Sequence, residues 1–205
     1  MPMVCLHTRD NHTSAKHPEA MKSSPVILGL FIFAVVATPL VSGAEQAPKA
    51  DEKRPTADEQ TEAGFKLMKT ERLGKLRFEM KAKEVVGIYG KATTQGAVEN
   101  WEGVGLYVQQ WNYPALGLEL QMSAEKKNGE AKVYTIKATK ACKLVTTHGI
   151  QIGSTEQEVI QAYGDVKGDE SEAGKTFVAG STVGGVIFTF KDGKVAEIFI
   201  GAGSE

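Results

Sequence analysis

The chain has 205 residues, with 24 basic and 25 acidic side chains and a formal net charge of −1. A balance this close to neutral excludes the strongly basic proteins that bind nucleic acid through phosphate contacts, and it gives no general attraction to an anionic membrane. Two cysteines and four histidines leave little material for a disulfide framework or a histidine-based metal site. We therefore expect no nucleic-acid partner, no metal and no cofactor.

Residues 1–44 indicate a leader that contains a secretory signal peptide. Lys22 precedes the apolar run VILGLFIFAVVATPLV (26–41), and small residues follow at 42–44. A basic start, a short apolar centre and small residues are typical of a cleaved signal, and we expect cleavage after Ala44. Residues 1–20 resemble neither a signal nor a domain, so we expect translation to start at Met21.

The alternative interpretation of this leader is a membrane anchor that is not cleaved. The apolar run contains Pro39 and is shorter than the ~20 residues that cross a bilayer, which favours cleavage. We therefore expect a soluble periplasmic or secreted protein that has no stable membrane insertion after cleavage. The cleaved chain would not begin with a cysteine, which disfavours attachment of a lipid there.

Residues 45–64, EQAPKADEKRPTADEQTEAG, are charged and contain Pro48 and Pro55. They contain almost no large apolar side chains, so they cannot bury enough surface to offset the entropy lost on ordering. This composition predicts a flexible linker without a fold of its own.

Two later segments share a sequence pattern. KLRFEMKAKEVVGIYGK begins at Lys75, and GIQIGSTEQEVIQAYGD begins at Gly149. The matched pairs are Leu76 and Ile150, Phe78 and Ile152, Glu84 and Glu158, Val85 and Val159, Val86 and Ile160, Tyr89 and Tyr163, and Gly90 and Gly164. Each segment is followed by a tight-turn signal, Asn-Gly at 128–129 and Asp-Gly at 192–193, which predicts a β-hairpin.

The pattern predicts an α+β protein of two tandem repeats, residues 65–140 and 141–205, each a short helix packed on a small antiparallel meander. In the second repeat, Thr155 and Glu158 form a capping-box signature at the start of a helix, and Gly164 is placed to end it. Alternation of apolar and polar residues at 116–122 predicts a strand with one buried face.

The second repeat also resembles a known family. The residues that carry the resemblance are Gly149, Ile150, Ile152, Gly153, Ser154, Thr155, Val159, Tyr163 and Gly164. They resemble the SmpA/OmlA family of small bacterial envelope proteins, and the tandem arrangement is similar to that of the β-lactamase-inhibitory proteins, which grip a protein partner with a concave sheet surface. The chain departs from both, because no lipidated cysteine follows the leader and Cys142 has no disulfide partner beyond it. The resemblance implies an exported scaffold without catalytic activity.

An aromatic segment, GLYVQQWNYP (105–114), supplies the candidate binding site. Strand alternation sends Leu106 and Val108 to one face and every second residue from Tyr107 to the other. If the first pair faces the core, the rings are exposed in the manner of binding hot spots. The predicted protein-binding residues are Trp101, Tyr107, Gln109, Trp111 and Tyr113. The alternative is that these rings fill the junction between the two repeats.

Catalytic candidates are few once residues 1–44 are removed. Cys142 and His148 are the single candidate pair, and their spacing has no recognised catalytic geometry. A buried, inert thiol is the favoured interpretation of Cys142, and a reactive thiol is the alternative.

We therefore expect a protein that is not an enzyme and that binds another protein of the cell envelope. The second hypothesis is a carrier that holds a small apolar ligand between the repeats. The third is an enzyme that uses Cys142 and His148.

Overall fold

The computed structural model describes residues 55–203, so the expected leader, the cleavage after Ala44 and the proposed start at Met21 lie outside the described residues. The class is α+β, as predicted. The helices are α1 (Ala57–Thr70), α2 (Ala82–Tyr89) and α3 (Glu156–Tyr163), with short 3-10 turns at Pro114–Leu116 and Gly164–Val166. The strands are β1 (Thr94–Trp101), β2 (Leu106–Tyr113), β3 (Leu118–Ala124), β4 (Lys132–Ala138), β5 (Thr176–Gly180), β6 (Gly185–Lys191) and β7 (Lys194–Gly201).

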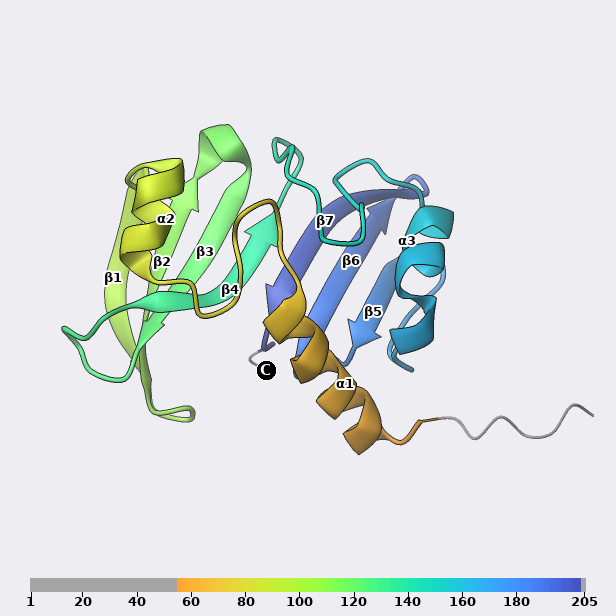
Figure 1. Ribbon diagram of the computed structural model, residues 1–205, viewed down its shortest axis with the longest axis horizontal. Helices are drawn as coiled ribbons and strands as arrows, with labels where there is room; N and C mark the ends of the chain where they lie inside the picture. The colour runs from red at the N-terminus through yellow and green to blue at the C-terminus, as the bar shows by residue number, and fades with distance from the viewer. Residues whose placement is uncertain (1–54, 204–205) are drawn as a thin grey trace, which may run out of the picture. The chain divides into compact units, whose positions relative to one another are not determined.

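All seven described strands form a single antiparallel sheet in the order β1-β2-β3-β4-β7-β6-β5 (Figure 1). Strands β4 and β7 pair directly, with Ile136 opposite Ile200 and Ala138 opposite Ile198. The expected pair of small sheets is therefore one continuous sheet. Pairing between the last strand of each meander satisfies backbone groups that two separate sheets would leave at their edges.

One face of this sheet forms the core. Leu120, Ile136, Phe188 and Ile198 lie on it and are almost completely buried. The helices lie over this face (Figure 1), and Val85 of α2, Val159 of α3 and Met68 of α1 belong to the same apolar cluster. Burial of a side chain of this size contributes about 1.5–3 kcal/mol, so the shared face holds the helices in place.

Helix α1 corrects the prediction of a flexible linker at 45–64, because it begins at Ala57. A capping box starts the helix: Glu59 N donates to Thr56 Oγ1 at 3.3 Å, and Thr56 N donates to Glu59 Oε2 at 2.7 Å. Gln60, Gly64 and Met68 are buried at four-residue spacing. The helix is amphipathic despite its charge, and packing on the sheet supplies the stability that its composition alone does not.

Helix α1 packs closely on the sheet through a contact between glycines. A Cβ atom on Gly64 would lie 1.8 Å from the carbonyl oxygen of Gly184, and one on Gly180 would lie 2.3 Å from Gly64 Cα. Only residues without a side chain allow the backbones of helix and hairpin to approach this far.

Helix α3 begins where the sequence predicts. Thr155 and Glu158 form the expected capping box of α3, and α2 begins directly after Lys81. Their ends differ. Gly90 ends α2 with a φ of 79°, whereas Gly164 keeps a helical φ of −57° and continues into a 3-10 turn. The α-helix therefore stops at Gly164, as predicted, but without the positive φ that Gly90 adopts.

Within residues 55–203, we find no helix with the length and apolar character needed to span a membrane.

Adding a methyl group at Gly64 tests the seating of α1. We expect Gly64→Ala to lower the free energy of unfolding by about 1–3 kcal/mol, because helix and hairpin must move apart. Gly87→Ala is the matched control, since nothing lies within 4 Å of its added Cβ. The free energy of unfolding of that variant should rise by up to about 1 kcal/mol, because alanine has a higher helix propensity than glycine. Urea unfolding measures both, and equal effects would contradict the close contact.

Candidate functional site

Trp111 and Tyr113 lie on the core face of the sheet. They pair with Leu120 and Leu118 of β3, whose side chains are buried, and their own exposed fractions are 7% and 3%. The prediction that these two rings are exposed is therefore wrong. The alternation along β2 is as expected, but Trp111 and Tyr113 lie on the core face. Val108 lies on the other face, where it is nevertheless buried, at 4% exposed.

Hydrogen bonds fix both buried rings inside the first half of the domain. Trp111 Nε1 donates to Gln109 Oε1 at 2.9 Å, and Gln109 Nε2 donates to the carbonyl oxygen of Gly96 at 2.9 Å. The Tyr113 hydroxyl donates to the carbonyl oxygen of Gly90 at 3.1 Å. Since Gly90 directly follows α2, Tyr113 ties the end of that helix to the sheet. Both rings lie on β2 and do not fill the junction between the predicted repeats, which is the β4–β7 pair.

Trp101 and Tyr107 are half-buried. The Trp101 ring meets Tyr134 edge to face, with centroids 6.4 Å apart, and Tyr134 also packs on Phe78 at 6.4 Å. Tyr107 lies opposite Ala124 on β3. The five predicted binding residues therefore do not form one exposed surface.

The opposite face of the sheet, which we call the uncovered face, carries a mixture of side chains. Phe199 of β7 lies between Lys137 of β4 and Ile187 of β6 in register, and all three are half-buried. Lys137 Nζ lies 3.1 Å from Glu197 Oε2, and the hydrogen bond to this carboxylate raises the pKa of Lys137. Polar side chains, among them Gln121, extend the face across β3. None of the helices in the described range lies over it (Figure 1).

Glu71 is the most buried charged group that sequence reasoning missed. Its side chain has no exposed surface, and it directly follows α1. Oε1 accepts hydrogen bonds from the backbone N–H groups of Arg72 at 2.9 Å and Thr147 at 2.7 Å. Oε2 accepts from Tyr163 Oη at 3.0 Å and lies 2.9 Å from His148 Nδ1. The carboxylate thus ties α1 to the loop before α3 and to α3 itself.

Tyr163 acts in this network as a neutral phenol. Its hydroxyl lies 2.9 Å from Thr146 Oγ1, and its ring packs on His148 and Phe188. Burial is the main cause of a large increase in the pKa of Tyr163, which keeps the proton that it donates to Glu71. The network is fully hydrogen-bonded, as a buried polar cluster must be to remain stable.

The candidate catalytic pair is divided between two environments. Cys142 is buried in the apolar core beside Gly117, and this burial raises the pKa of its thiol. His148 is 43% exposed, and its Nδ1 is engaged by Glu71. These surroundings stabilise a protonated thiol rather than the thiolate that a nucleophilic cysteine requires.

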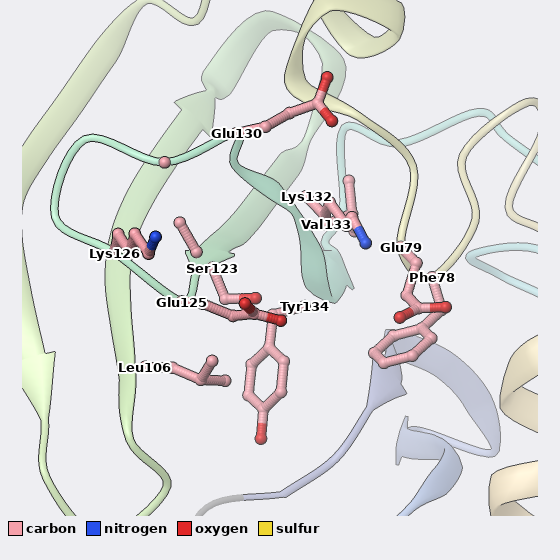
Figure 2. A pocket seen from close by; sticks show the side chains of 12 residues that line it. Phe78, Glu79, Leu106, Ser123, Glu125, Lys126, Glu130, Lys132, Val133 and Tyr134 are labelled. Carbon is pink, nitrogen blue, oxygen red and sulfur yellow. The ribbon is translucent and has the colours of Figure 1, made fainter.

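A cavity of about 470 Å³ lies beside the aromatic contact of Phe78 and Tyr134 (Figure 2). Leu106 and Val133 contribute apolar walls. Charged side chains from the β3–β4 hairpin and from the segment before α2 also line it, and these are Glu79, Glu125, Lys126, Glu130 and Lys132. No sequence signal marked this place, because its lining comes from three separated segments.

Across residues 55–203, no group of three or more histidine, cysteine, aspartate or glutamate side chains is arranged to hold a metal ion. Comparisons of the chain with protein-family models, with curated proteins and with solved structures find no match. Function must therefore be argued from the geometry of this chain.

Truncating Trp111 tests its place in the core. We expect Trp111→Ala to lower the free energy of unfolding by about 3–5 kcal/mol, because it removes a buried ring and leaves Gln109 without its partner. Trp101→Ala serves as the comparison. It should lower the free energy of unfolding by clearly less, since that ring is half-buried. Chemical denaturation measures both variants. A Trp111→Ala protein as stable as the parent would restore the exposed-face prediction.

Removing the Glu71 carboxylate tests the tie between α1 and α3. Glu71→Ala leaves two backbone N–H groups and the Tyr163 hydroxyl without their acceptor. We therefore expect the free energy of unfolding to fall by about 3–5 kcal/mol. Glu99→Ala, on the exposed strand β1, is the control and should stay within about 0.5 kcal/mol of the parent. Hydrogen exchange of the α1 amides should accelerate in the first variant alone.

Proposed function

We propose that this protein binds another protein through the uncovered face of its sheet. The observation that carries the proposal is the asymmetry of the sheet. One face is buried beneath three helices. The other mixes half-buried side chains, such as Ile187 and Phe199, with buried ones, Val108, Thr135 and Val178. A sheet face that keeps a partly exposed Phe and Ile at its centre gains free energy when a partner covers it.

This face combines an apolar centre with polar and charged neighbours. Ile187 and Phe199 form an apolar centre, and the Lys137–Glu197 ion pair lies directly beside it. Gln110 and Gln121 extend the face with amide groups that can donate and accept hydrogen bonds. Apolar centres with polar rims are typical of non-obligate interfaces. The corrected candidate surface therefore replaces Trp111 and Tyr113 with residues of β4, β6 and β7.

We also infer that the domain contains two related units, the finer form of the predicted tandem repeat. Corresponding hydrogen bonds of equal length support it. Glu79 N donates to Val133 O at 2.8 Å, and Gly153 N donates to Val195 O at 2.8 Å.

The return bonds match as well. Val133 N donates to Met80 O at 2.9 Å, and Val195 N donates to Ser154 O at 2.8 Å. In each unit, the two residues that precede the N-cap of the short helix are thereby hydrogen-bonded to the start of the last strand of the meander.

Export to the cell envelope and the absence of catalysis remain parts of this proposal. The carrier hypothesis receives less support, because the junction between the units is a strand pair whose core-facing side chains, Ile136, Ile198 and Ile200, are at most 1% exposed. The enzyme hypothesis is weakened by the burial of Cys142. The resemblance to SmpA/OmlA proteins rests on the short motif alone.

Substitutions on the uncovered face test the proposed interface. Phe199→Ser and Lys137→Glu should each abolish capture of at least one protein from an envelope extract, because they remove the apolar centre or reverse its neighbouring charge. Ile160→Ser on α3 is the matched control, since Ile160 is also partly exposed, at 38%. It should leave capture unchanged.

The thermal midpoints of all three variants should be measured first, so that loss of capture is not confused with unfolding. If every protein captured by the parent is captured equally by both sheet variants, the uncovered face is not the interface.

A further inference from the structure

We propose that the cavity beside Phe78 and Tyr134 binds an alkylammonium group. The ammonium could belong to a free small amine or to a lysine side chain of a protein partner. The second source rests on the proposed protein-binding function, whereas the chemistry of the cavity does not.

The cavity combines aromatic and aliphatic walls with acidic side chains. Phe78, Tyr134 and Leu106 supply the apolar part, and Figure 2 shows Glu79 close to the Phe78 ring and Glu125 above Tyr134. Its volume of about 470 Å³ suits a small ligand or one long side chain. An alkyl chain that ends in an ammonium matches both parts, because its methylenes pack on the rings and its charge meets a carboxylate.

The backbone of Glu79 supplies a second, independent observation. Its φ is 58°, in the left-handed region that favours glycine. The matched position in the other unit, with the same N–H hydrogen bond to the last strand, is Gly153, with a φ of 94°. A glycine would therefore satisfy the fold at position 79. A strained glutamate in its place, lining a cavity, indicates a role for its carboxylate.

Charges around the cavity leave two carboxylates available for a ligand. Glu130 is already bound, with Oε2 2.8 Å from Lys81 Nζ. Glu79 and Glu125 form no ion pair with any residue in the described part of the chain. Lys126 and Lys132 also line the cavity, so a cation must lie away from them. Glu79 and Glu125 are its available counter-charges, and the backbone conformation of Glu79 singles that residue out for the test.

Calorimetric titration with 1,5-diaminopentane and with Nα-acetyl-lysine N-methylamide, whose side-chain ammonium is free, tests the site, and 1-pentanol is the uncharged control. We expect saturable binding of at least one amine and none of the alcohol. Binding of the diamine assigns a free amine as ligand, whereas binding of the lysine derivative alone assigns a partner's side chain. If neither amine binds at up to about 10 mM, or if the alcohol binds equally well, the proposal is overturned.

Three variants separate binding from stability. Glu79→Gln should weaken amine binding at least tenfold with little change in the thermal midpoint, since the backbone conformation is kept. Glu79→Gly should also lose binding, yet raise the midpoint by about 2–4 °C because it removes the strain. Asp192→Gly is the control, since Asp192 is the other non-glycine residue of the described chain with positive φ, at 53°. It should keep full binding.

A Glu79→Gly protein that binds amines like the parent would remove the assigned role of this carboxylate. Trp101 offers an independent reporter, because its ring contacts Tyr134. Its fluorescence should change on amine binding in a Trp111→Phe background. Phe199→Ser should leave amine binding intact, so failure of the uncovered-face proposal can be told apart from failure of this one.

Discussion

The pairing of β4 with β7 is the constraint on which the rest of the structure depends. It joins the meander of β1 to β4 to that of β5 to β7, so that the strands share one core face. The helices must then lie on the same side, because an amphipathic helix is stable only where its apolar stripe is buried. The opposite face carries polar and half-buried side chains together with a few buried ones, such as Val178, and the candidate interface follows from this division.

A second constraint acts through Glu71, which joins parts of the chain that the sheet does not connect. Its carboxylate accepts hydrogen bonds from the loop before α3 and from Tyr163 within α3. A buried carboxylate is costly to desolvate, so it persists only where several donors compensate for the lost water. Here three donors and the ring nitrogen of His148 surround it, which makes the end of α1 part of the second half of the domain although it lies early in the sequence.

Local patterns predicted the class, the capped start of α3 and the alternation of the strands, since these depend on neighbouring residues. Placement in three dimensions was harder to predict. The alternation along β2 could not say which face met the core, and Trp111 was assigned to the wrong one. A merged sheet requires knowledge of the partner strand, which no short pattern contains. Helix α1 did carry a signal, a capping box at Thr56 and Glu59 with small or apolar residues spaced by four, but its charged composition obscured it.

The two related units that we infer would also separate function from fold. Positions that match in both, such as Val85 and Val159 at 0% exposure, are buried and maintain the packing of a helix on the sheet. Where matched positions differ, stability alone does not explain the choice of residue. Gly153 adopts a positive φ without strain. Glu79, at the corresponding turn, adopts a positive φ with strain, and it places a carboxylate beside the aromatic pair of Phe78 and Tyr134. If both units descend from one ancestor, the first is slightly less stable at this turn because Glu79 stands where a glycine would fit. The same residue supplies the carboxylate that we propose binds the ligand.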